Sequence, residues 1–355
     1  MNNKNYTIKD IARLSGVSIG TVDRVLHNRG NVSEKAEQKV KKVLEEIDYQ
    51  PNLVARTLKK NRVCRFSVLI PDYRKDTYWY QPYLGTQHAA KDLRQFNLSI
   101  QEHLFDPSDK GSFKEMAREA LSTQPDGFLV APFFFKESLE FFKECDRQKI
   151  PYITFNTHIE EASPLSFIGQ NLHKSGRLAA HLLHMNRVAL KKLLVLHVEE
   201  DVSASRHLQE KEAGFREYFK VLGAEEWVQT LVLGNGSMKE ELAKYLHQHE
   251  DLSGVFVTSS KAYRVLQSFT KIKKQLVIVG YDLLEKNIEH LKKGEIDYLI
   301  HQNPYRQAYL GVSYLFEDLI YKKDIPKEVL LPLDIITSEN YEEYLAGQER
   351  KGDLK

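Results

Sequence analysis

A group of carboxylate, amide and aromatic residues closely follows apolar runs that predict β-strands. Paired sugar hydroxyls need acceptors and bidentate amides, and the C–H face of a sugar stacks on an aromatic ring. The group comprises Asp72, Tyr73, Trp79, Asn156, Asp282 and Gln302. These residue types favour a sugar-binding site. The alternative is that several of them only cap strand ends or lie on the surface.

The apolar runs alternate with helical patterns along most of the chain. Strand-like runs at 66–70, 98–101, 127–132 and 151–155 are separated by helices, and the rhythm restarts after 166–169 and continues to 301. Short apolar strands that alternate with helices predict a parallel sheet with helices on both faces. Two consecutive halves predict two lobes, whose ligand groups lie at the carboxyl ends of the strands and face a common cleft.

The first residues follow a different pattern. Thr7 to Leu26 contains two short helical patterns, with Gly16 at the turn between them and Ser18 in position to cap the second. A third helix is predicted from Ser33 to about Asp48. Helices this short are not stable alone, so we expect a helix-turn-helix whose second helix enters a DNA major groove.

Charge is distributed unevenly between these parts. Residues 1–62 contain 13 Lys and Arg against 7 Asp and Glu, although the whole chain has a net charge of only +2. The excess positive charge favours phosphate binding by the N-terminal segment. Combined with the helix-turn-helix pattern, it indicates a nucleic-acid partner.

Composition narrows the class of protein. A chain of 355 residues predicts two or three domains, and two cysteines suit a reducing cytosol rather than a disulfide framework. No apolar run approaches the roughly 20 residues of a membrane span, and no apolar signal core opens the chain, so we expect a cytoplasmic protein.

Signals for catalysis, cofactors and metals are weak. His181 and His184 are three residues apart on a predicted helix, but no Cys or acidic ligand pattern accompanies them. The sequence offers no phosphate loop, paired catalytic acids or convincing nucleophile–base set. We therefore expect a non-enzymatic protein with no cofactor and no metal site.

The N-terminal 60 residues resemble the DNA-binding head of the LacI/GalR family of bacterial transcription regulators. The residues that carry the resemblance are Thr7-Ile8-Lys9-Asp10-Ile11-Ala12, Gly16-Val17-Ser18, Thr21-Val22, Arg24-Val25-Leu26, Val32-Ser33, Tyr49-Gln50-Pro51-Asn52 and Ala55-Arg56-Thr57-Leu58. The DNA contacts that this resemblance implies are at Thr7, Ser18, Ile19, Gly20, Thr21, Arg24, Asn31, Asn52, Ala55 and Leu58.

The implied roles differ among these residues. Ser18, Ile19 and Gly20 occupy positions that reach base edges, Arg24 a DNA-contacting position, and Thr21 and Asn31 phosphate-binding positions. Leu58 matches a minor-groove wedge on a hinge helix, with packing against the following domain as the alternative.

Two positions depart from the family pattern. Asp23 replaces a serine, so it either orients Arg24, accepts from a cytosine amino group, or serves only as a surface partner within the helix. Gly20 lacks a base-reading side chain. Both changes predict an operator that differs from the common family sequence.

The remainder resembles the periplasmic sugar-binding fold, closest to its ribose-binding branch. The supporting segments are Phe167-Ile168-Gly169-Gln170-Asn171, Ser175-Gly176, Gly214-Phe215, Val279-Gly280-Tyr281-Asp282, Lys293-Gly294 and Ile300-His301-Gln302-Asn303-Pro304. The resemblance places Asn156, Asp282 and Gln302 at ligand positions and Lys211 at a ligand arginine. Arg206 is a candidate for the missing guanidinium, and Ser259 replaces a common ligand Asn.

The expected fold class is an all-α helix-turn-helix head followed by an α/β two-lobed body with two doubly wound parallel sheets. The expected domains are a DNA-binding domain at 1–50, a hinge helix at 51–62, an effector-binding body at 63–340 and a tail at 341–355. The lobes are expected at about 63–163 with 303–325, and at about 166–300 with 328–340. Chain crossings between the lobes are expected near 162–166, 301–304 and 324–332.

These features predict a sequence-specific transcription regulator, a repressor, that binds a double-stranded DNA operator as a homodimer. A small ligand, a sugar or sugar derivative bound between the lobes, would control operator affinity. The alternative is a DNA-binding regulator that responds to a protein partner and retains a vestigial cleft.

Overall fold

The structure is a computed structural model that describes residues 6–26, 30–47, 49, 63–185, 192–199, 205–234, 238–269 and 276–346. It divides into two compact units, residues 1–62 and 63–355, here called the head and the body. The predicted hinge helix at 51–62, with Asn52, Ala55 and Leu58, lies outside the described residues, as does the part of the predicted tail from 347 onward.

Three helices form the head around a small apolar core. Their bounds are α1 (Ile8–Ser15), α2 (Ile19–Leu26) and α3 (Glu34–Glu46). The buried side chains between them are Ile11, Ala12, Val22, Val40 and Val43. Each helix is too short to persist alone, so their shared core is what stabilises them.

Local chemistry sets the boundaries of the first two helices. Thr7 begins α1 with a capping box, in which its hydroxyl accepts from the Asp10 amide and the Asp10 carboxylate accepts from the Thr7 amide. Gly16 ends α1 in a left-handed conformation, φ 64°. The Ser18 hydroxyl then accepts from the Thr21 amide at 3.1 Å. The predicted helix-turn-helix is thus confirmed, although Ser33 makes no side-chain cap to α3.

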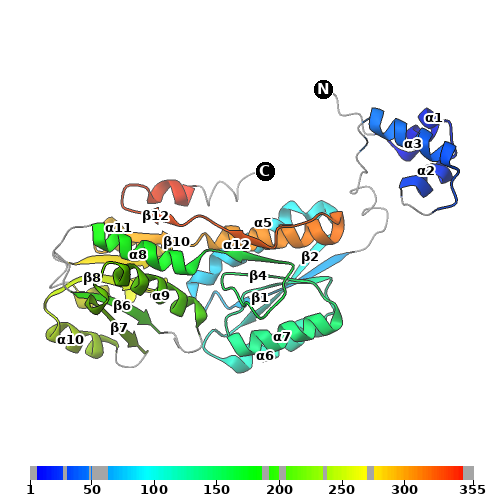
Figure 1. Cartoon of the computed structure of the whole chain (residues 1–355). Helices are drawn as coiled ribbons and strands as arrows, with labels where there is room; N and C mark the ends of the chain where they lie inside the picture. Colours follow the sequence, from blue (N-terminus) through cyan, green and yellow to red (C-terminus); the bar gives the residue numbers. More distant parts are fainter. Residues whose placement is uncertain are drawn as a thin grey trace. The chain divides into compact units, whose positions relative to one another are not determined.

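The body contains two six-stranded sheets (Figure 1). The first sheet has the order β11-β5-β4-β3-β1-β2, and all of its strand pairs are parallel. Its strands are β1 (Cys64–Pro71), β2 (Leu98–Phe105), β3 (Gly127–Val130), β4 (Tyr152–Phe155), β5 (Ser166–Gly169) and β11 (Glu328–Leu330).

The second sheet repeats this arrangement with the order β12-β10-β9-β8-β6-β7, and only its β10–β12 pair is antiparallel. Its strands are β6 (Lys192–Val198), β7 (Val228–Leu233), β8 (Leu252–Val257), β9 (Val277–Tyr281), β10 (Tyr298–His301) and β12 (Asp334–Ile336). The central strands are buried on both sides, as their continuous apolar runs predict.

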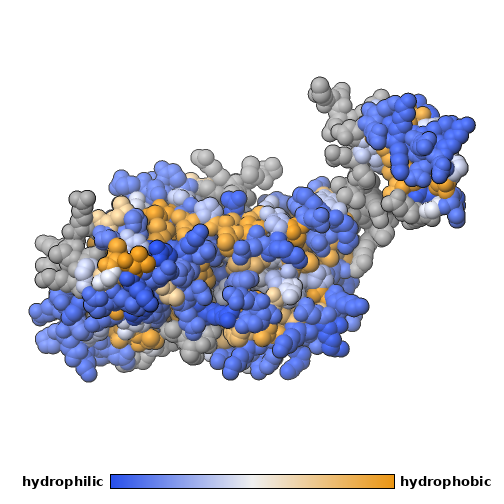
Figure 2. Space-filling view, viewed as in Figure 1, coloured by the Kyte–Doolittle hydropathy of each residue, from blue (hydrophilic) through white to orange (hydrophobic). Residues whose placement is uncertain are grey.

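Helices cover both faces of each sheet. The first lobe has α5 (Tyr80–Asp92) and α12 (Pro304–Phe316) on one face, and α6 (Lys110–Ser122) and α7 (Phe135–Gln148) on the other. The second has α8 (Leu172–Met185) and α9 (Arg206–Val221) on one face, and α10 (Met238–Gln248) and α11 (Glu285–Lys292) on the other. Hydrophilic residues dominate the surface over α6, α7 and α10 (Figure 2). The predicted doubly wound, two-lobed body is confirmed.

The lobe boundaries differ from those expected. Strand β5 pairs with β4, and β11 pairs with β5, so both belong to the first sheet although the sequence placed 166–169 and 328–330 in the second lobe. A strand of three or four residues is compatible with either sheet, and only its partner strand decides between them. The chain therefore crosses between the lobes directly after β5, after β10 and after β11.

One side chain ties these crossings together. Gln170, which is buried, follows β5 at the first crossing. Its Nε2 donates to the carbonyl of His301 at 3.0 Å and to that of Pro332 at 2.5 Å, and these two carbonyls lie at the second and third crossings. The three chain segments that cross between the lobes are thus held together by the side-chain amide of Gln170.

The start of the predicted tail belongs to the second lobe. Residues 341–346 are helical, and the Tyr341 ring packs in the same core as Leu291 and Ile336. The Lys292 ammonium lies 4.8 Å from the centre of that ring. The Tyr341 side chain therefore docks the start of the predicted tail onto the second lobe.

A hydrogen-bonded network beneath the second sheet centres on Glu212. Its carboxylate bonds His197 Nε2 at 2.7 Å and accepts from Arg216 Nε at 2.7 Å and from the Thr230 hydroxyl at 2.5 Å. Burial acts to raise the pKa of Glu212, but these hydrogen bonds outweigh burial and lower the pKa to about 2, from an ordinary value of 4.5. The network therefore stabilises the fold fully above about pH 4.5, and this contribution is lost as the pH falls toward 2.

We expect Glu212→Gln to lower the free energy of unfolding at pH 7 by roughly 2 kcal/mol, because the charged hydrogen bonds are lost. The variant should also lose less stability than the wild type between pH 4.5 and 2. Urea unfolding at several pH values measures both effects. Glu210→Gln, an exposed change on the same helix, is the control. Parallel pH curves for wild type and Glu212→Gln would contradict the assignment.

Candidate functional site

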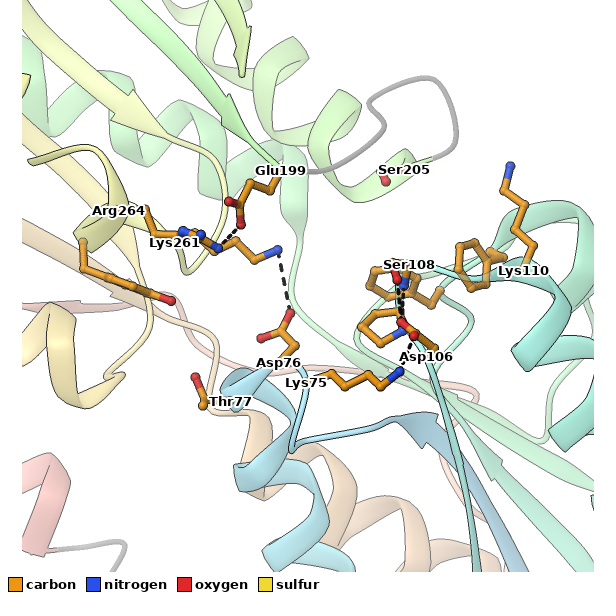
Figure 3. Close-up of a pocket in the computed structure, with 14 residues that line it drawn as sticks. Lys75, Asp76, Thr77, Asp106, Ser108, Lys110, Glu199, Ser205, Lys261 and Arg264 are labelled. Atoms are coloured by element: carbon orange, nitrogen blue, oxygen red, sulfur yellow. Dashed lines mark hydrogen bonds and ion pairs between the residues drawn. The ribbon is translucent and has the colours of Figure 1, made fainter. Parts of the chain in front are cut away.

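The cleft between the lobes opens at the carboxyl ends of their strands, as parallel sheets predict. A cavity of about 540 Å³ lies at its mouth, and charged side chains from both lobes line it (Figure 3). Lys75 forms an ion pair with Asp106 within the first lobe, and Arg264 with Glu199 within the second. The volume and polarity of this cavity suit a small polar ligand.

A smaller inner cavity of about 40 Å³ shares Asp76 and Phe133 with the outer one. Its lining residues are Asp76, Tyr78, Trp79, Phe133, Asn156, His207, Lys211, Ser259, Ser260 and Gln302. Little space is left beside these residues in this arrangement of the lobes.

The first lobe contributes an aromatic wall and an amide. Trp79 is only 3% exposed, and its ring meets those of Tyr78, Phe133 and Phe155 edge-on at centroid distances of 5.1 to 6.3 Å. Asn156 follows β4 in a left-handed conformation, φ 71°, and its Nδ2 donates to the Tyr78 hydroxyl. Asn adopts this conformation readily, and its side chain lines the inner cavity.

The second lobe contributes a buried ammonium and an oriented amide. Lys211 is 1% exposed, its Nζ donates to the Thr258 carbonyl at 3.0 Å, and it lies 3.7 Å from the centre of the Tyr281 ring. Gln302 lines the inner cavity, and its backbone N and Nε2 donate to the Asp282 carboxylate at 2.9 and 2.6 Å. The Asp282 carboxylate thus orients the Gln302 side chain by accepting its hydrogen bonds.

Two predicted ligand residues on the first lobe point elsewhere. The Asp72 carboxylate accepts from the Arg74 guanidinium at 2.8 Å, and this hydrogen bond, outweighing burial, lowers the pKa of Asp72. The Tyr73 ring packs 4.5 Å from that of Tyr83 on α5. Neither Asp72 nor Tyr73 is among the described residues that line either cavity. A position directly after a strand did not suffice to predict a cavity-lining side chain, because the loop turns Asp72 and Tyr73 away from both cavities.

Arg206 has a different partner from the one expected. It lies at the start of α9, where its guanidinium bonds the Glu161 carboxylate of the first lobe at 3.2 and 3.3 Å and stacks 5.0 Å from the centre of Phe135. It borders a separate groove that also contains His173 and Gln170. Arg206 bridges the lobes there, away from the two cavities described above.

Several cavity residues escaped the sequence analysis: Asp76, Tyr78, His207, Ser260 and Lys261. Asp76 caps η1 (Thr77–Trp79), a short 3₁₀ turn, by accepting from the Tyr78 amide at 3.1 Å. The pattern Asp-Thr-Tyr-Trp was a signal for such a capped turn. Ser260 and Lys261 directly follow Ser259, so the loop after β8 was itself a signal for them.

On the head, the predicted base-reading positions lie at the surface. Ser18, Ile19 and Gly20 are exposed at the start of α2, and Arg24 is exposed one turn later. Ile19 exposes half of its surface. An exposed apolar residue beside hydroxyl and guanidinium groups fits contact with a thymine methyl group and base edges.

The part of the chain that the structure describes offers no metal site. No group of three or more His, Cys, Asp and Glu residues in those ranges is placed to hold a metal ion. His181 and His184 instead each contact the Tyr218 hydroxyl, at 3.0 and 2.9 Å. Among the described helices, none is both long and apolar enough to cross a bilayer.

The exposed face of the helix-turn-helix and the polar cleft between the lobes define a DNA-binding head joined to a two-lobed ligand-binding body. Residues 7–52 match the family of bacterial regulatory proteins named lacI, and residues 66–323 match the periplasmic binding protein domain. The chain belongs to the LacI family of ligand-controlled, DNA-binding transcription regulators.

Individual relatives agree with this assignment. The sucrose operon repressor of Streptococcus mutans is 22% identical over 342 residues, which cover 94% of this chain and 98% of that protein. Catabolite control protein A of Staphylococcus xylosus is 30% identical over 152 residues, but the match spans only 44% of its length. A crystal structure of a LacI transcriptional regulator from Bacteroides fragilis is 29% identical with a TM-score of 0.74, and it covers 80% of this chain and 100% of that one.

Proposed function

We propose that this regulator represses transcription by binding its operator as a homodimer, and that a sugar or sugar derivative in the cleft controls its operator affinity. The observation that carries the proposal is the pairing of an exposed helix-turn-helix surface with an aromatic and amide-lined cleft in one chain. In this proposal the protein acts in the cytoplasm, and the cleft binds its ligand without turning it over.

The operator contacts are assigned to the exposed face of the head. Ser18, Ile19 and Gly20 would meet base edges, with Arg24 donating to a guanine or a phosphate. Thr7, Thr21 and Asn31 would hold the DNA backbone, and Asn52, Ala55 and Leu58 would act in the hinge segment. Because Gly20 offers no side chain, the base opposite it should be read weakly.

The sugar contacts are assigned to the inner cavity. Trp79 and Phe133 would stack on the C–H face of the ring, while the amides of Asn156 and Gln302 bond its hydroxyls. The Lys211 ammonium would donate to a further oxygen. A sugar is also the class of ligand suggested by the name of the Streptococcus mutans relative, the sucrose operon repressor.

A homodimer would give the regulator two heads for a two-fold symmetric operator. The first lobe offers a surface for it, since the rings of Tyr73, Tyr80 and Tyr83 cluster at the start of α5 and Tyr80 is 47% exposed. Exposed aromatic rings of this kind are enriched at protein interfaces.

A thermal-shift screen of the full chain with sugars, sugar phosphates and nucleosides tests the ligand assignment, because a ligand at 100 times its Kd stabilises the native state by about 2.7 kcal/mol. The ligand found should then change the affinity for an operator selected in vitro. Trp79→Ala should weaken binding of this ligand about tenfold, since the aromatic ring on which the sugar stacks is lost.

Trp227→Ala, at the other tryptophan of the chain and outside both cavities, is the matched control and should leave the affinity unchanged. If every compound were silent, the regulator would instead respond to a protein partner. Equal loss of binding in both tryptophan variants would show that Trp79 acts only through stability.

A further inference from the structure

Two charged side chains face each other across the mouth of the cleft. Asp76 comes from the loop after β1 in the first lobe, and Lys261 from the loop after β8 in the second. The Lys261 Nζ lies 3.9 Å from Asp76 Oδ2, and each side chain is only 18% exposed (Figure 3). Such a partly buried pair is screened less by salt than a pair on the open surface.

Each partner also belongs to a segment that forms a wall of the inner cavity. Asp76 caps the turn that carries Tyr78 and Trp79, through the Tyr78 amide. Lys261 directly follows Ser259 and Ser260, which line the opposite side. Contact between Asp76 and Lys261 therefore brings the aromatic wall and the serine wall together.

The inner cavity between the aromatic wall and the serine wall is narrow. The space beside Trp79 and Gln302 is only about 40 Å³, so separation of the two walls would widen the access of a ligand to these residues. The other two ion pairs at the mouth, Lys75 with Asp106 and Arg264 with Glu199, each lie within one lobe and do not resist this separation.

We propose that the Asp76–Lys261 ion pair is a latch between the lobes, which sets the closed fraction of the cleft before ligand binds. A ligand that enters must break this ion pair. When the lobes are closed over a bound ligand, the same ion pair opposes release of the ligand. Lobe closure itself does not depend on the proposed sugar ligand, whereas the effect on effector affinity rests on the proposed function.

The test uses the full, ligand-free protein with nitroxide labels on exposed residues of the two lobes, introduced by Glu115→Cys on α6 and Lys244→Cys on α10. The native Cys64 and Cys145 are buried, and burial raises the pKa of the Cys145 thiol, so both react slowly. Pulsed electron resonance then gives the distribution of distances between the lobes.

Asp76→Asn and Lys261→Gln remove one charge each, and the asparagine keeps an oxygen that can cap the Tyr78 amide. Each variant should lower the ratio of closed to open protein about fivefold, and the double variant should lower it no further, because one interaction is lost in all three. Lys75→Gln is the matched control, since its partner Asp106 lies on the same lobe.

Salt provides a second measurement that needs no substitution at the latch. Raising sodium chloride to about 1 M should populate open distances in the labelled wild-type chain. The effect should be smaller in the double variant, in which the Arg206–Glu161 pair still joins the lobes but the latch is gone. Unchanged distributions in both single variants, or additive opening in the double variant, would overturn the latch. Neither result would bear on whether the protein binds a sugar or an operator.

Discussion

Removal of residues 1–62 is expected to abolish specific operator binding while leaving the body folded. The body, residues 63–355, has its own cores in both lobes, whereas the exposed helix α2 with Ser18 and Arg24 lies entirely in the head. Specific binding exceeds non-specific binding by at least about a thousandfold in typical regulators, and the truncated chain should lose all of that difference. Fluorescence anisotropy with a labelled operator measures the loss.

The truncated body should keep its thermal unfolding transition and its response to the effector. Specific operator binding by the truncated body would contradict the assignment of DNA recognition to the head. A point variant gives a finer comparison in the full chain. Arg24→Ala should cost about 1 to 3 kcal/mol of operator binding, since the proposed contact of its guanidinium to a guanine or a phosphate is lost. Arg13→Ala, at an exposed arginine of α1, is its control.

Gly176→Ala is expected to destabilise the second lobe by about 3 kcal/mol, because α8 and α9 touch backbone to backbone at this position. A Cβ added to Gly176 would lie 1.8 Å from the carbonyl oxygen of Lys211, and one added to Gly214 would lie 1.9 Å from that of His173. Neither backbone carbonyl can move away from the added Cβ atom unless its whole helix shifts. Chemical denaturation of the body measures the loss.

The same substitution should disturb the cleft, since the obstructed carbonyl belongs to Lys211, whose ammonium lines the inner cavity. Effector affinity should therefore fall along with stability. Gly234→Ala is the matched control, because a Cβ there meets nothing within 4 Å. Equal stability of the Gly176→Ala and Gly234→Ala variants would show that the two helices lie farther apart than the structure places them.

Much of the fold was predictable because its signals are local. The capping residue Thr7, the left-handed Gly16 and the capping Ser18 each act within four residues, and the apolar spacing of α1 and α2 completes the pattern. The alternation of short apolar strands with helices likewise predicted both sheets. These features depend on backbone propensity and burial, which neighbouring residues largely decide.

The cleft was predictable only in part. Trp79, Asn156, Lys211 and Gln302 were expected at a ligand site, and they line the inner cavity. Their roles in binding stay predictions. Asp282 was expected beside them, yet its carboxylate serves to orient Gln302, from which it is 20 residues distant in the chain.

The helix-turn-helix head, the two-sheet body and the kind of polar residue at the strand ends could all be predicted from local patterns in the sequence. That β5 and β11 join the first sheet and that Asp76 meets Lys261 from the other lobe emerged only from the folded chain. The physical reason is distance along the chain. Helix caps and strand periodicity are written in adjacent residues, whereas strand partners and contacts across the cleft arise between segments that meet only when the chain has folded.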